Sequence, residues 1–173
     1  MTHFKDLSDY AFLDSVSRPG TKNIGWLALA DEFEKLEPTE TILDLLWSFC
    51  SISVAQTRGL HDCEFCSQNS SFVAERHGQR LLLGSAEIRV FSADAKIYAA
   101  PNLIYHYVSV HHYRPPEEFV LALEEGPQPT TQKYFERLSE TGLEWSKTLV
   151  PTVDQVRFRF EKTERGVVKR LCE

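Results

Sequence analysis

The chain places two of its four cysteines in one short loop, Cys63-Glu64-Phe65-Cys66. Two thiolates separated by two residues can reach one ion from a tight turn, and zinc takes four nitrogen or sulfur ligands in a tetrahedron. In a reducing compartment such a pair indicates a metal or redox site more often than a structural disulfide. The pair therefore predicts half of a metal site, and the chain must supply two further ligands.

Three of the six histidines lie close together at His106, His111 and His112. His106 and His111 have four residues between them, which falls within the H-x3-5-H spacing of Cys2His2 zinc sites. We expect His112, and His61 just before the cysteine loop, to be alternative ligands or to lie outside the site. The predicted ligands of a structural zinc ion are Cys63, Cys66, His106 and His111.

The spacing of the two histidines requires the helix that carries them to end irregularly. A step of five residues on a regular helix rotates the second side chain by about 140°, so both rings cannot reach one ion from ideal geometry. The helix must end in a tightened or widened turn, which Pro115 favours because it disfavours helix at Arg114. The gap from Cys66 to His106 far exceeds the roughly 12 to 15 residues of a small zinc finger. The ion would therefore connect a loop to a distant helix across a hydrophobic core.

Composition limits the class of protein. A chain of 173 residues with 42% hydrophobic residues can bury a full core. A net charge of −6 argues against a nucleic-acid surface, because phosphate contacts need clustered lysine and arginine. We find no signal peptide and no apolar stretch near 18 residues, so we expect a cytoplasmic protein without a membrane segment. The acidity suits a partner protein with a basic surface.

Helices are predicted from caps and periodicity. Thr39 is a plausible N-cap for a helix with apolar residues at positions 42, 45, 46 and 49. Pro101 is expected in the first turn of a helix over residues 102–112. Pro115 and Pro116 end that helix and begin another, which stops before Gly126. Residues 131–139 are predicted to form the last helix.

Strands are predicted at residues 80–83, 86–91 and 96–100, with a turn at 92–94. Phe158 and Phe160 alternate with charged residues like a half-buried strand, and Glu164-Arg165-Gly166 can turn it back as a hairpin over 167–171. An apolar segment at 24–29 is a buried strand or an irregular core piece, and residues 51–71 are polar and rich in turns.

Together these elements predict an α+β fold, with a small antiparallel sheet, packed helices and one zinc-stabilised core. We expect a zinc-type domain over residues 1–125. Residues 126–173 would form a C-terminal helix and β-hairpin extension packed on it.

Other uses of the metal site remain open. A catalytic zinc would keep one position for water and need a carboxylate base, for which Glu64 and Glu87 are candidates, although neither lies in an H-E-x-x-H helix. The H-x-E and P-C-x-x-C pattern of nucleobase deaminases is absent. A redox dithiol is a third alternative, but the polar segment before Cys63 differs from the apolar strand that precedes a thioredoxin-like pair.

Several motifs resemble those of a family of uncharacterised bacterial proteins. They are a G-x-H-x-C-x-x-C loop from Gly59, a G-S-x-E-I-R-V strand from Gly84 and an H-Y-V-x-x-H-x-Y-x-P-P-x-E-F region from His106. The resemblance covers residues 1–125 and implies a compact zinc-type domain, with the four predicted ligands at matching positions. It implies no known activity.

The leading functional hypothesis is a zinc-binding protein-interaction module whose acidic surface meets a basic partner; an immunity-type protein that neutralises a basic bacterial toxin is one form of it. A zinc-dependent hydrolase with an open metal position and Glu87 as base is the alternative. A redox sensor that releases zinc when Cys63 and Cys66 oxidise is a further one.

Overall fold

The computed structural model describes residues 3–12, 18–57, 59–66, 73–147, 149–150, 157–163 and 166–172, with side chains up to residue 147. Its centre is a five-stranded sheet in the order β1-β6-β5-β2-β7. The strands are β1 (Thr21–Asn23), β6 (Ile97–Pro101), β5 (Glu87–Phe91), β2 (Ile52–Val54) and β7 (Trp145–Lys147). All neighbours pair antiparallel except β1 and β6, which run parallel. The predicted α+β class is confirmed, and the sheet is mixed because of this one parallel pair.

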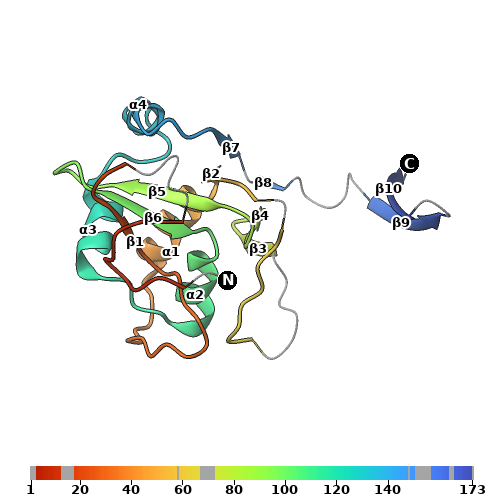
Figure 1. The fold of residues 1–173 in the computed structure, drawn as a ribbon, viewed down its shortest axis with the longest axis horizontal. Coiled ribbons are helices and arrows are strands. Elements are labelled where there is room, and N and C mark those ends of the chain that lie inside the picture. The colour runs from red at the N-terminus through yellow and green to blue at the C-terminus, as the bar shows by residue number, and fades with distance from the viewer. Residues whose placement is uncertain are drawn as a thin grey trace.

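Four helices flank this sheet: α1 (Glu40–Cys50), α2 (Ile104–His111), α3 (Glu117–Glu125) and α4 (Gln132–Glu140). In Figure 1, α1, α2 and α3 lie below strands β5 and β6, and α4 lies above β5. Each helix contributes buried apolar side chains to one core that also takes in β2 and β5. Among the described helices, none has the length and apolar character needed to cross a membrane.

The helix starts follow the sequence signals. Thr39 caps α1, because its Oγ1 accepts a hydrogen bond from the Ile42 amide at 3.3 Å. Pro116 is the N-cap of α3, and Glu117 lies in its first turn, where a carboxylate favours the helix dipole. Thr131 caps α4 in the same way as Thr39 caps α1. These three predicted helices are confirmed.

Two smaller sheets complete the described chain. The strands β3 (Val73–Arg76), β4 (Gln79–Leu82) and β8 (Leu149–Val150) form one of them. Strands β9 (Arg157–Thr163) and β10 (Gly166–Cys172) form the predicted C-terminal hairpin. The burial of Phe158 and Phe160 and the turn residues Glu164 and Arg165 lie outside the described residues, so those expectations stay predictions.

Two expectations from the sequence are corrected by the structure. Residues 52–54 form a strand between β5 and β7, inside a segment expected to be a polar loop. Three residues are too few to show an alternating pattern, and all three of these are buried. Pro101 ends β6 and does not begin α2, which starts at Ile104. Residues 24–29, expected to be a buried strand or an irregular core piece, follow β1 and form no strand, and residues 24–27 are buried, as the second alternative predicts.

Candidate metal centre

The cysteine pair lies on the loop between β2 and β3, at a tight turn through Glu64 and Phe65. The Cys66 amide donates to the Cys63 carbonyl at 3.3 Å and closes this turn. Both thiols therefore face the same side of the loop and contact the histidines of α2. The Cys63 side chain is buried, and Cys66 is partly exposed. Both are free thiols.

The helix α2 ends in a widened turn, as the histidine spacing predicts. His112 follows the helix with a φ of 58°, in the left-handed region. The carbonyl of Tyr107 accepts from the His112 amide and, at 3.0 Å, from the Tyr113 amide, five and six residues further on. This closure rotates the last helical residue relative to a regular helix. It lets His111 point to the same place as His106, and their Nε2 atoms lie 3.2 Å apart.

Four of the separations between the candidate ligand atoms match those of a tetrahedral zinc site. All four atoms lie within 4.8 Å of one another. Cys63 Sγ is 3.2 Å from His111 Nε2, and Cys66 Sγ is 3.4 Å from the Nε2 atoms of His106 and His111. Zinc bonds of about 2.3 Å to sulfur and about 2.05 Å to nitrogen place a sulfur and a nitrogen roughly 3.5 Å apart, and two nitrogens roughly 3.3 Å apart. The structure thus brings Cys63, Cys66, His106 and His111 together into a group that could hold a metal ion.

Burial controls the charge of these groups. Burial, followed by the charge of His111, lowers the pKa of His106 from 6.5 to about 4, so its imidazole is neutral. Burial also lowers the pKa of His111 and raises the pKa of the Cys63 thiol to about 11. Neutral imidazoles are ready to bind a cation, whereas a buried thiolate needs a cation to neutralise it. The donor set therefore fits a divalent metal.

Contacts outside the four ligands hold the loop in place. The His61 amide donates to the Gly84 carbonyl at 2.8 Å and fixes the start of the loop to the segment between β4 and β5. Glu64 Oε2 accepts from the Leu29 amide at 3.0 Å, and this hydrogen bond lowers the pKa of Glu64. The Phe65 ring packs edge-on against Phe33, with centroids 5.4 Å apart. The loop is thus tied to residues 28–33 as well as to α2.

The remaining candidate residues have other positions. His112 pairs with Glu37 at 3.0 Å, and neither it nor His61 belongs to the group of four. Glu87 is 2% exposed and accepts from the Tyr10 hydroxyl and from Arg89. It thus lies in a buried network apart from the metal-binding group, as far as the described residues extend.

Sequence reasoning missed the supporting role of Phe33 and assigned Glu64 only as a candidate base. Contacts between residues about 30 positions apart leave no local pattern in the sequence. The one available signal was the position of Glu64 and Phe65 inside the turn between the two cysteines, which leaves their side chains free to contact other segments.

Comparison with known proteins gives a family and no activity. A family model described as a domain of unknown function (DUF7919) matches residues 2–124. Because this match covers more than half of the chain, the protein belongs to the DUF7919 family. No curated protein and no solved structure matches it.

Proposed function

We propose that this DUF7919 protein is a zinc-stabilised protein-interaction module, with one structural Zn²⁺ bound by Cys63, Cys66, His106 and His111. The observation that carries the proposal is the close approach of four soft or borderline donors from two distant segments. Two thiolates and two imidazoles suit zinc better than the oxygen-preferring magnesium or calcium. The three described cysteines are free thiols, which suits a reducing cytosol.

A structural role follows from the number of ligands. Four protein donors fill a tetrahedral zinc shell, whereas catalytic zinc sites keep one position for water. A hydrolase would also need a base with access to that water, and Glu87 is buried with hydrogen-bond donors on its carboxylate. We therefore favour a zinc ion that holds the loop at residues 59–66 to α2.

The interaction role rests on charge. A net charge of −6 favours encounter with a basic partner protein, since complementary potentials speed association. A basic bacterial toxin is one form such a partner could take.

The zinc proposal is tested by the metal content of the purified protein. We expect one zinc per chain by elemental mass spectrometry. Removing it with a chelator should lower Tm by about 10 °C or more, because losing several kcal/mol shifts Tm by about 2 to 4 °C per kcal/mol in a chain of this size. A metal-free protein of equal stability would overturn the proposal.

The ligand assignment is tested by two neighbouring histidines. His111→Ala should lose the zinc and show the Tm of the chelated protein. His112→Ala should keep one zinc, because this side chain pairs with Glu37 outside the group. Full zinc content in His111→Ala would show that the ligand set is wrong.

A further inference from the structure

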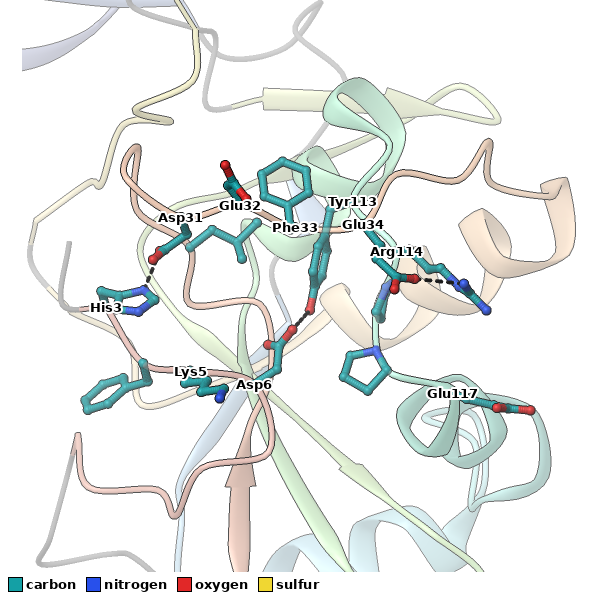
Figure 2. Close-up of a pocket in the computed structure, with 14 residues that line it drawn as sticks. His3, Lys5, Asp6, Asp31, Glu32, Phe33, Glu34, Tyr113, Arg114 and Glu117 are labelled. Atoms are coloured by element: carbon teal, nitrogen blue, oxygen red, sulfur yellow. Dashed lines mark hydrogen bonds and ion pairs between the residues drawn. The ribbon is translucent and has the colours of Figure 1, made fainter.

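A large cavity lies beside the metal centre, between three segments that are far apart in the sequence. It has a volume of about 700 Å³ and is walled by residues 3–6, 31–34 and 113–117 together with Leu27. Figure 2 shows these segments facing one another across the opening. This volume is within the range of sites that bind ligands. Its apolar wall consists of Phe4, Leu27, Phe33, Tyr113, Pro115 and Pro116.

The charge of this cavity is strongly one-sided. Five carboxylates line it, against two permanent cations, Lys5 and Arg114. Three of the carboxylates are engaged: Asp6 accepts from the Tyr113 hydroxyl at 2.6 Å, Asp31 pairs with His3, and Glu34 pairs with Arg114. The other two are Glu32 and Glu117. We call this site the acidic cavity.

Glu32 and Glu117 are the groups available to an incoming cation. Both are exposed, and within the described residues neither forms an ion pair. They lie on different walls, one on the segment before α1 and one at the start of α3. Figure 2 shows the two carboxylates at opposite sides of the cavity, both pointing outward, so each one would meet a basic side chain separately at the rim. A lysine or arginine side chain entering the cavity would also meet aromatic rings, which attract cations through their faces.

An apolar groove continues from the acidic cavity. This groove has a volume of about 210 Å³ and shares Tyr113, Arg114, Pro115 and Glu117 with the cavity. Its other apolar walls include Leu36, Ile42, Val108 and Val120. Leu36 is 57% exposed, so an apolar side chain entering the groove would cover it. A small polyamine could use only the cavity, whereas a peptide could place a basic side chain in the cavity and an apolar one in the groove.

Residues next to the four candidate ligands contact two walls of this site. Phe65, inside the cysteine turn, packs against Phe33 and also lies 5.5 Å from the His111 ring, centroid to centroid. Phe33 in turn packs edge-on against Tyr113 at 5.6 Å. The Leu36 amide donates to the His112 carbonyl at 2.9 Å, directly after the helix that carries both histidines. The shape of the cavity therefore depends on the loop and helix that the ion joins.

We propose that the acidic cavity and the apolar groove together dock a segment of a partner protein in which lysine or arginine stands beside apolar side chains. The proposal rests on the proposed interaction function and gives it a site. Charge complementarity selects the basic side chain, and the adjoining groove selects a peptide over a free amine.

The test uses the zinc-loaded full chain, labelled with ¹⁵N, and a blocked hexapeptide that carries two lysines and two leucines between glycines. We expect this peptide to shift the amide signals of residues 31–34 and of Tyr113, Arg114 and Glu117. A peptide with glutamate in place of lysine should leave them unmoved. The double variant Glu32→Gln/Glu117→Gln should bind the basic peptide about five- to tenfold more weakly, because each exposed charge pair contributes up to about 1 kcal/mol.

The matched control is Glu124→Gln/Glu144→Gln, which removes the same charge from exposed positions outside both sites. Its affinity should change less than twofold. An equal loss in both double variants, or shifts on another face, would overturn the docking site while leaving an acidic interaction surface in place. Spermine that shifts the same amides with equal affinity would overturn the peptide as occupant, and a peptide that shifts no amide would overturn the site altogether.

Zinc content and Tm are measured on the same samples, so the two proposals fail separately. One zinc per chain with an unresponsive cavity would leave the structural metal standing and remove the docking site. Chelation provides a second readout: peptide affinity should fall when the metal is removed, because Phe65 and His112 no longer hold the cavity walls.

Discussion

The carboxylate of Glu87 shows how burial sets the pKa and the hydrogen bonding of a residue in this protein. Both of its oxygens accept from the Tyr10 hydroxyl, at 2.9 and 3.0 Å, and one accepts from Arg89 at 2.7 Å. The Arg89 guanidinium also lies over the Tyr10 ring, 4.9 Å from its centroid. Burial raises the pKa of Glu87, and the nearby Arg89 opposes that rise. The network joins the N-terminal segment to β5 and makes Glu87 a structural residue.

Removing one donor from this network should be costly. In Tyr10→Phe the buried carboxylate loses its hydroxyl partner, so we expect a loss of about 1 to 3 kcal/mol in the free energy of unfolding. That corresponds to about 3 to 10 °C in Tm, which scanning calorimetry can measure. Tyr98→Phe is the matched control, because the Tyr98 hydroxyl bonds to Glu118, whose side chain is 42% exposed. Equal losses in the two variants would refute the importance of the network.

At the scale of elements, the sequence predicted those helix starts that are set by residues within a few positions of them. Thr39 and the two prolines at positions 115 and 116 locate the starts of α1 and α3, because caps and missing amides act within a few residues. The strands β1, β2 and β7 have three residues each, too few for periodicity to identify them. They exist because distant partners pair with them.

The same contrast between local signals and long-range contacts applies to the candidate metal centre. Residue type and spacing were enough to select the four residues that the structure brings together, and the spacing of five predicted that α2 ends in a tightened or widened turn. The contact of Phe65 with Phe33 could not be predicted, since it depends on how residues 28–36 lie against α2. The alternative His112 could be separated from His111 only by the direction in which the chain turns after Tyr107, and His61 only by how the cysteine loop lies against Gly84.

The candidate site also requires a glycine at position 84, between β4 and β5. Gly84 has a φ of +84°, and a Cβ there would lie 2.5 Å from the His61 carbonyl oxygen. Gly84→Ala should therefore displace the start of the cysteine loop and lower both Tm and zinc content. Gly78→Ala is the matched control, because Gly78 has a φ of +70° but no atom within 4 Å of such a Cβ.

We expect Gly78→Ala to cost about 1 to 2 kcal/mol from backbone conformation alone and to keep its zinc. Gly84→Ala should cost about 1 to 3 kcal/mol more, because backbone must move. Thermal unfolding and zinc content of the two variants distinguish the effects. Identical behaviour would mean that the loop adapts without disturbing the ligands.

On the scale of the whole molecule, the proposed metal would join a loop and a helix that lie far apart in the sequence. The loop at residues 59–66 belongs to no strand or helix, yet it contacts α2, the segment at residues 28–33 and Gly84. The main core, in contrast, is continuous through β2, β5 and all four helices. We therefore expect the zinc-free protein to keep its core and to lose order first around the loop and the acidic cavity.

Acid should break the link that the proposed ion makes between the loop and α2. The direction of this pH dependence follows from the pKa shifts. His106 has a pKa of about 4 in the fold against 6.5 normally, so the unfolded chain takes up this proton first as the pH falls. Its contribution to stability is complete above about pH 6.5 and is lost as the pH falls towards 4. Zinc acts in the same direction, because the ion needs a neutral imidazole and a deprotonated thiol. The Cys63 thiol, with a pKa of about 11 before the metal binds, must release a proton, which alone weakens zinc binding about tenfold per pH unit of acidification.

The difference in Tm between zinc-loaded and zinc-free protein isolates the effect of the metal from other acid-sensitive carboxylates. We expect this difference to be large at pH 7, to shrink steadily below pH 6.5 and to vanish near pH 4, with zinc released over the same interval. Calorimetry across a buffer series, with zinc measured after dialysis at each pH, provides both curves. Parallel Tm curves for the two forms would mean that the ion is not held by these ligands, because a Cys2His2 site cannot keep its metal once protons occupy its donors.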